Sequence, residues 1–293
     1  MTPRSWRPLV PYALLSPVYA LVGVVLIYPA VQNVWLSLWS WRITAPTQAT
    51  FVGLENYGRL LLEDPEFVSV LGFTGAFTVS SIALEFLLGL GGALLLNSLP
   101  WVRPAATPLL LLPYMVPAVV VGLVWRLLWT KEYGLVNFLL GLVGLPPVLW
   151  LGEPFAAGVA VVVSEVWRST PFVTLVLLAV LASLPEEPYE AAEVDGAGRW
   201  QSFWHITLPL LLPSLTVALL FQTIFKLRVF DLIFILTGGG PGIATLPLGI
   251  LVYRQYFRYF EGGYAAALAV TTLGIGALVS LAYLRVMYRH VER

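Results

Sequence analysis

Two apolar stretches of this sequence contain polar side chains of the kind that bind a hydrophilic molecule by hydrogen bonds. Glu165 and Arg168 are three residues apart, so they share one face of a helix. Gln222 and Lys226 are four apart and share one face of the next apolar segment. Ionisable groups in such segments are costly unless they pair or face water. The pattern therefore predicts a hydrophilic pocket between two helices.

A structural interpretation competes with this one. Glu165 could pair with Arg168, and Lys226 or Arg228 with Asp231, only to hold neighbouring helices together. The residue types do not decide between the two interpretations.

Glu85 is the one charge in another apolar run. We expect it to have a structural role, pairing with a buried arginine such as Arg168 or Arg126.

The most polar stretch of the chain reads "EAAEVDGAGRWQSFWHITLP" and lies between two apolar runs. Ser183 and Glu186 have the spacing of a capping box, which predicts the start of a short helix. Gly196 and Gly198 are expected to end it, because glycine permits backbone angles that other residues resist. A second short helix over 199–205 follows, so we predict a helix–turn–helix projection.

The elements that position these groups are long and apolar. Of the 293 residues, 59% are hydrophobic and 11% charged, against about 25% charged in ordinary soluble domains. A helix needs roughly 20 apolar residues to cross the hydrocarbon core. Six runs are long enough: 10–39, 67–96, 104–128, 155–184, 208–236 and 264–288. We predict an all-α polytopic membrane protein with six transmembrane helices, since lipid satisfies no backbone polar group.

The arginines indicate the orientation in the membrane. Arg4, Arg7, Arg103 and the arginines after the last run fall on one side of a six-helix topology, which is expected to be the cytoplasm. Both termini and the loop 185–205 are then cytoplasmic. Arg254 and Arg258 oppose this assignment. The first run is too long for a signal-peptide core, so we expect it to be retained.

Composition excludes several classes of function. A net charge of zero and the lack of a basic tract argue against nucleic acid as a partner. Without cysteine there is no disulfide, iron–sulfur centre or thiol nucleophile. The only lysines, Lys131 and Lys226, do not stand in a phosphate-binding loop, and His205 and His290 are too far apart for an H-E-x-x-H zinc site. We expect no metal, no cofactor and no enzyme activity in this chain.

The polar stretch also carries a family pattern. It fits EAA-x3-G-x9-I-x-L-P at each fixed position: Glu190, Ala191, Ala192, Gly196, Ile206, Leu208 and Pro209. In this it resembles the membrane-spanning subunits of binding-protein-dependent ABC importers. "FVGLENYGRLL", "GLVNFLL", "LTGGGPGIAT" and "GGYAAALAV" are similar to stretches of the sugar-type permeases, so the resemblance covers nearly the whole chain.

The resemblance implies a single permease domain over 1–293 in a prokaryotic cytoplasmic (inner) membrane. The loop 185–205 would seat in a cleft of an ATPase subunit, which binds the ATP and works as a dimer. Further implied partners are a second, unlike permease and an extracytoplasmic solute-binding protein, which would dock at the turn "TGGGPG" braced by Asp231. The coupling residues it implies are Glu190 for polar contact, Gly196 for the turn, and Ala191, Ala192 and Asp195.

The resemblance also implies a sugar substrate, with a neutral di- or oligosaccharide favoured. Counted outward from the EAA pattern, positions that touch sugar in maltose-type permeases correspond to Glu165, Arg168, Ser169, Gln222 and Lys226. Trp167 and Phe225 could stack on the sugar. Arg168 and Lys226 could instead bind glycerol-3-phosphate or a related phosphorylated polyol. An ion-coupled secondary transporter is a further alternative, although it would not need an ATPase-docking loop.

Overall fold

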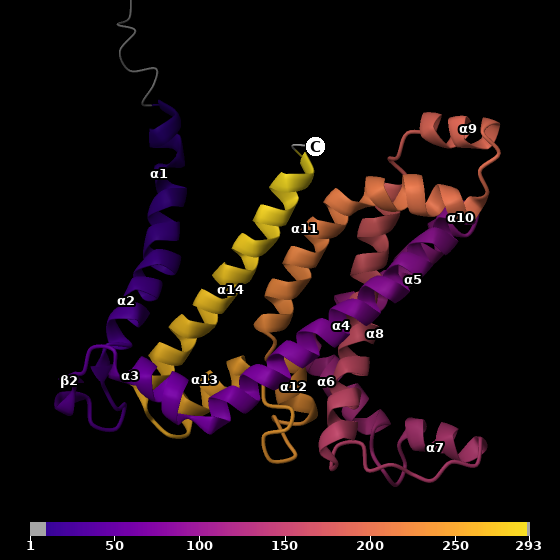
Figure 1. The fold of residues 1–293 in the computed structure, drawn as a ribbon. Helices are drawn as coiled ribbons and strands as arrows, with labels where there is room; N and C mark the ends of the chain where they lie inside the picture. Colours follow the sequence, from indigo (N-terminus) through magenta and orange to yellow (C-terminus); the bar gives the residue numbers. More distant parts are fainter. Residues whose placement is uncertain (1–9, 292–293) are drawn as a thin grey trace, which may run out of the picture. The chain divides into compact units, whose positions relative to one another are not determined.

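The computed structural model describes residues 10–291 and is almost entirely helical in that range (Figure 1). The chain divides into two compact units. Unit 1 comprises residues 1–64 and 252–274, and unit 2 comprises residues 65–251 and 275–293. The all-α membrane fold predicted from the sequence is confirmed, whereas a single permease domain stays a prediction.

Unit 1 contains the first span and a small loop that packs on the start of the last span. In chain order its elements are α1 (Val10–Val22), η1 (Gly23–Ile27), α2 (Tyr28–Leu36), β1 (Trp39–Ser40), η2 (Pro46–Gln48), β2 (Thr50–Phe51), α3 (Glu55–Gly58), η3 (Arg59–Glu63), the end of α13 (Leu248–Phe257) and the start of α14 (Gly262–Val291). Strands β1 and β2 pair antiparallel, with Trp39 opposite Phe51.

Two of the family-like stretches meet in this unit. Asn56, from "FVGLENYGRLL", donates a hydrogen bond to the main-chain oxygen of Trp39 at 3.0 Å. Gly263, from "GGYAAALAV", packs so closely that a Cβ there would lie 1.9 Å from the same oxygen. Arg59 forms an ion pair with Glu261 at 2.8 Å. These stretches therefore join the first loop to the last span.

Unit 2 contains the remaining spans. Its elements are α4 (Pro65–Ser98), α5 (Arg103–Met115), α6 (Ala118–Leu128), α7 (Leu135–Leu142), α8 (Pro154–Leu181), α9 (Glu187–Val194), α10 (Arg199–Ser202), η4 (Phe203–Thr207), α11 (Leu208–Leu227), α12 (Asp231–Leu236), the first turn of α13 and the later turns of α14. Helices α4 and α8 pack along each other. A core cluster from α4, α8 and α11 consists of Ala93, Leu96, Val173, Leu177, Leu178, Leu181 and Leu211.

Five helical segments are long and apolar enough to cross a membrane, and a bent pair brings the number to six. The predicted third span is not straight, since α5 and α6 meet at an angle of 89°. Val116 and Pro117 at the break have extended backbone angles. Proline has no N–H and disfavours helical angles in the residue before it, so the helix ends there.

The fifth span also differs from the prediction of 208–236. The spanning helical segment is Arg199–Leu227, formed by α10, the π-helical η4 and α11. Residues Asp231–Leu236 form a separate helix, α12, which packs against α6 and buries Leu232, Ile233 and Leu236. The predicted run contains the charged residues Arg228 and Asp231 at this break, but a charge does not by itself end a helix.

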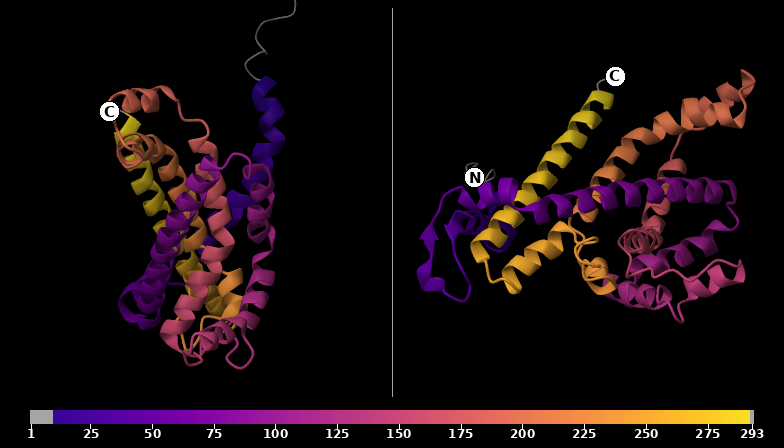
Figure 2. Two further views of the ribbon diagram at one scale, coloured as in Figure 1. Left: turned by 90° about the vertical axis from the view of Figure 1, so that its right-hand side faces the viewer. Right: turned by 60° about the horizontal axis from the view of Figure 1, so that its bottom comes forward.

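The two ends of unit 2 are formed by different elements. Figures 1 and 2 show α9, α10 and the last turns of α14 at one end, with α7 and its loops at the other. The predicted loop 185–205 and the C-terminal turns thus share an end of this unit. The position of that end relative to the cytoplasm stays a prediction from the arginine distribution.

Candidate functional site

A cluster of buried charges joins three spans of unit 2. Lys226 Nζ of α11 lies 2.7 Å from Glu85 Oε1 of α4, and the two side chains are 1% and 0% exposed. The same ammonium group donates hydrogen bonds to Glu165 and, at 3.0 Å, to Ser169, both on α8. One lysine therefore bridges α4, α8 and α11.

Arg168 completes the charge balance of this cluster. Its Nε and Nη2 donate to the two carboxylate oxygens of Glu165 at 3.1 and 2.8 Å, and Ser169 Oγ donates to Glu165 at 2.9 Å. Two carboxylates thus face two cations. Glu165 is both paired and hydrogen-bonded, as a buried charge requires, whereas Glu85 is held by its ion pair with Lys226.

The structure confirms the expected partner of Glu165 and corrects the expected partner of Glu85. Glu165 pairs with Arg168 as predicted. Glu85 pairs with Lys226 instead of with an arginine, and Arg126 donates to the carbonyl oxygen of Ile235. The sequence placed these partners on the wrong helices because nothing local indicates which spans are neighbours.

Lys226 does not pair with Asp231, since its partners are the two buried glutamates. Four of the five predicted binding residues line one hollow of 310 Å³, and Lys226 lies behind its wall. The predicted residues on this hollow are Glu165, Arg168, Ser169 and Gln222.

Residues that the sequence did not assign to this site complete its lining: Tyr114, Ala118, Arg228, Val229, Phe230, Asp231 and Leu232. Phe225 lines it as predicted, whereas the Trp167 ring packs edge-on against Trp125 at 5.8 Å between ring centroids. Arg228 and Asp231 lie within the predicted fifth span. Their charge was the sequence feature that could have assigned them to the site. Tyr114 comes from α5 and could be placed only by the fold.

The EAA segment forms a short exposed helix that ends at Gly196. The N–H of Gly196 bonds to the carbonyl of Glu193 at 3.0 Å, and the N–H of Ala197 bonds to that of Ala192 at 2.8 Å. Gly196 has φ of +75°. This is a glycine-terminated Schellman motif. The predicted turn is confirmed.

The start of this helix differs from the prediction. The Ser183 hydroxyl bonds back to the carbonyl of Val180 at 2.8 Å, so it does not cap α9, which begins at Glu187 without a side-chain cap. The predicted coupling residues Glu190, Ala191, Asp195 and Gly196 are exposed, and Ala192 is half-buried.

The second predicted helix begins at Arg199 but does not end near His205, because it continues through η4 into α11. Tyr189 of α9 and Thr207 of η4 are joined by a hydrogen bond of 3.0 Å between their hydroxyl oxygens. The exposed helix α9 is therefore fixed to the start of a membrane span.

The glycine-rich turn after α12 is held by threonines. Thr237 and Thr245 are joined by a hydrogen bond of 2.7 Å between their hydroxyl oxygens, and Thr245 also donates to the carbonyl of Gly240 at 2.6 Å. The N–H of Gly239 bonds to Thr237 at 3.1 Å. The predicted bracing role of Asp231 is not seen among the hydrogen bonds described for this turn.

Comparison with known proteins identifies the family. A family model described as "Binding-protein-dependent transport system inner membrane component" matches residues 85–291. The chain belongs to this family. It is accordingly a membrane permease component of the ABC importer type, as the EAA pattern indicated.

Relatives support this assignment over most of the chain, and a solved structure has the same fold. The chain is 40% identical to the trehalose/maltose transport system permease protein MalF of Thermococcus litoralis, covering 94% of this chain and 92% of that protein. It is 36% identical to the sulfoquinovosyl glycerol transport system permease protein SmoG of Agrobacterium fabrum, with 94% and 89% covered. A bacterial ABC transporter chain involved in alginate import has the same fold, with a TM-score of 0.83, 24% identity, and 98% and 99% covered.

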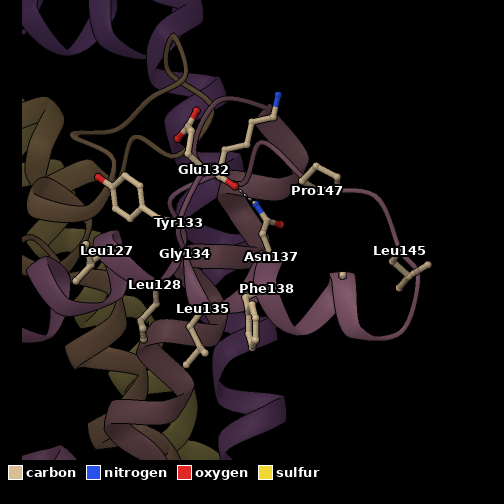
Figure 3. Close-up of a pocket in the computed structure, with 12 residues that line it drawn as sticks. Leu127, Leu128, Glu132, Tyr133, Gly134, Leu135, Asn137, Phe138, Leu145 and Pro147 are labelled. Carbon is tan, nitrogen blue, oxygen red and sulfur yellow. Dashed lines mark hydrogen bonds between the residues drawn. The ribbon is translucent and has the colours of Figure 1, made fainter.

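A cavity of 840 Å³, larger than the hollow lined by Glu165 and Arg168, lies at the α7 end of unit 2. It is bounded by the end of α6 and by α7 (Figure 3). Figure 3 shows Leu128, Leu135 and Phe138 along it, with Asn137 nearby. Asn137 accepts hydrogen bonds from the N–H of Val148 and the indole of Trp150, both at 3.0 Å. It also donates to the carbonyls of Lys131 and Val148, at 3.1 and 2.9 Å. One side chain therefore closes the loop between two spans.

We expect Asn137→Ala to destabilise the purified permease complex by about 2–4 kcal/mol, since each of four hydrogen bonds contributes about 1 kcal/mol. Thermal unfolding of the complex in lipid nanodiscs would measure the change. Asn97→Ala is the matched control, because Asn97 is exposed. Equal unfolding midpoints for the two variants would contradict the role of Asn137.

Proposed function

We propose that this chain is the membrane-spanning subunit of an ATP-driven importer that moves a sugar, delivered by an extracytoplasmic binding protein. The observation that carries the proposal is the hollow between α5, α8 and α11, in which Glu165, Arg168, Ser169 and Gln222 face an opening in the membrane segments. Sugars are bound by dense hydrogen bonding together with an aromatic surface. Here Phe225 and Tyr114 supply the aromatic surface.

Coupling to ATP hydrolysis belongs to the α9 end of unit 2. In the proposed assembly α9 enters a cleft of an ATPase subunit, two ATPases bind the ATP, and an unlike permease completes the pore. A short helix with a fixed end has little conformational entropy to lose on docking, which suits transmission of movement. The end with α9 and the last turns of α14 is then cytoplasmic, and the turn of Thr237–Thr245 faces the binding protein.

A neutral di- or oligosaccharide fits the hollow best. Glu165 and Arg168 neutralise each other, and Arg228 is accompanied by Asp231 on the same lining. The lining therefore has no excess charge. Relatives with permease names for trehalose/maltose transport support the same class.

A phosphorylated polyol is the second candidate, because the structure removes one objection to it. Glu165 would repel a phosphate if it were unpaired, but its charge is compensated by Arg168 and Lys226. Arg228 would then bind the phosphate. The ion-coupled carrier is not retained, because the chain belongs to the binding-protein-dependent family.

The test is solute-stimulated ATP hydrolysis by the complex reconstituted in liposomes with its ATPase, second permease and binding protein. We expect stimulation by one or more neutral di- or oligosaccharides across a panel that includes glycerol-3-phosphate. Stimulation by the phosphate ester alone would replace the first candidate with the second. Stimulation by no carbohydrate at all would contradict the proposal.

Gln222→Ala should weaken solute binding, because the buried amide lines the hollow. Loss of one hydrogen bond of about 1 kcal/mol raises the half-saturating solute concentration by roughly fivefold. The concentration dependence of transport measures this. Thr216→Ala on the same helix, outside the hollow, is the control. An unchanged half-saturating concentration in Gln222→Ala would place the solute elsewhere.

A further inference from the structure

Three aromatic side chains form an exposed cluster at the start of the fifth span. The rings of Trp200 and Phe203 stack with 5.9 Å between centroids, and Trp204 packs edge-on against both, at 5.7 and 5.4 Å. Trp200 is 72% exposed and Trp204 49% exposed. Neither the solute hollow nor the coupling helix uses these rings.

The cluster lies on a different face of its helix from the one that meets α9. Residues three and four apart share a helical face, which groups Trp200 with Phe203 and Trp204. The other side of the same segment meets the end of α9 around a hollow of 330 Å³. That hollow is lined by Ala192, Asp195, Gly196, Ala197, Gln201, Ser202, His205 and Ile206. The aromatic rings therefore do not support α9 by direct packing.

The cluster continues along the same span into a series of exposed apolar side chains. Arg199–Leu227 is one candidate membrane span. Exposed apolar side chains continue along it after Trp204: Leu210, Leu212, Val217 and Phe221. The polar residues Arg199 and Gln201 lie at the N-terminal end of the span. The aromatic cluster is thus placed where an apolar helix surface passes into a polar one.

A further exposed tryptophan lies at the same end of unit 2. Trp101, 80% exposed, is in the turn between α4 and α5. Its neighbours Pro100 and Arg103 line a hollow of 480 Å³ together with Tyr189 and Thr207. The turn between α4 and α5 therefore reaches the same level as the contact between α9 and η4.

We propose that Trp200, Phe203 and Trp204, together with Trp101, anchor this end of the permease in the headgroup layer of the bilayer. Tryptophan prefers that layer because its ring is apolar and its N–H is polar. The occupant of the exposed aromatic face is then phospholipid, and α10 with η4 lies in the membrane interface. The α9 helix, tied to η4 through Tyr189, is then joined to a segment held at the membrane surface.

The chain has no cysteine, so a cysteine introduced by substitution is its only thiol and can be labelled specifically. Nitroxide labels are attached at Trp204→Cys and at the control Val194→Cys, which is 89% exposed on α9. Labelling uses the chain with its second permease in nanodiscs of phosphatidylcholine and phosphatidylglycerol, with and without the ATPase. The measured quantity is the ratio of the label's collisions with apolar oxygen to its collisions with a water-soluble nickel chelate.

The label at Trp204→Cys should show a several-fold higher ratio of oxygen to nickel collisions than the label at Val194→Cys, with the ATPase present or absent. A label that collides with nickel until the ATPase is added would assign the face to a protein partner and overturn the proposal. A low ratio under both conditions would also overturn it. Loss of sugar transport would leave this ratio unchanged, so the anchor and the proposed function fail separately.

A second measurement uses the native tryptophans and does not depend on the folding of the cysteine variants. Lipids brominated near the headgroup should quench the native chain's tryptophan fluorescence more strongly than that of a Trp200→Phe, Trp204→Phe variant. Equal fractional quenching of the two proteins would contradict the anchor.

Discussion

Replacing Lys226 by Met is expected to cause a large loss of stability in the membrane segments. The substitution keeps the volume but removes the cation that Glu85 and Glu165 share. Removing one partner of a buried ion pair costs about 3–5 kcal/mol, because the remaining charge is left without compensation. The unfolding midpoint and the yield of assembled complex, measured in nanodiscs, should both fall.

A compensating substitution separates charge balance from loss of packing. In the variant with Lys226→Met and Glu85→Gln, Glu165 keeps Arg168 as its partner and the cluster is neutral again. Most of the lost stability should return, and a double-mutant cycle gives the coupling between the two sites. If the double variant is no more stable than Lys226→Met alone, the Glu85–Lys226 pair is not the stabilising contact.

Replacing Gly196 by Pro is expected to abolish stimulation of ATP hydrolysis by solute in the complete complex, while the chain still inserts and assembles. Proline fixes φ near −65°, whereas Gly196 has φ of +75°. Proline also removes the N–H that bonds to Glu193. The end of α9 must then unwind. Stimulation should fall by at least about tenfold, equivalent to about 1.4 kcal/mol.

Gly198→Ala provides the matched control two residues away. Gly198 has φ of −77°, and a Cβ there meets no atom within 4 Å. An alanine should therefore leave both assembly and stimulation near their original levels. Normal stimulation in the Gly196→Pro complex would show that the geometry of α9 does not transmit the movement.

Local patterns in the sequence were enough to place the spans and the coupling helix. Each membrane helix satisfies its own backbone groups, so length and apolarity predict it without knowledge of its neighbours. The turn at Gly196 depends on one residue type and on bonds to residues a few positions away. The EAA pattern lies in this short segment, whereas the family assignment rests on a match over residues 85–291.

Local signals also had limits where two interactions competed. The spacing of Ser183 and Glu186 fits a capping box, but the Ser183 hydroxyl bonds back to the preceding helix instead. Pro117 could have indicated the bend in the third span, since proline and the residue before it disfavour a continuous helix. The 89° angle between α5 and α6 is a property of the fold.

The partners of the buried charges were decided only by the tertiary structure. Glu85 and Lys226 are far apart in the sequence and meet because α4, α8 and α11 pack together. The same packing puts Gln222 on the hollow and Lys226 behind it, although both share a helix face by spacing. Sequence by itself therefore determined which segments cross the membrane and which one carries the coupling motif. The contacts between the segments depend on which helix faces pack together, and that arrangement determined which charges stabilise the fold and which line the proposed solute site.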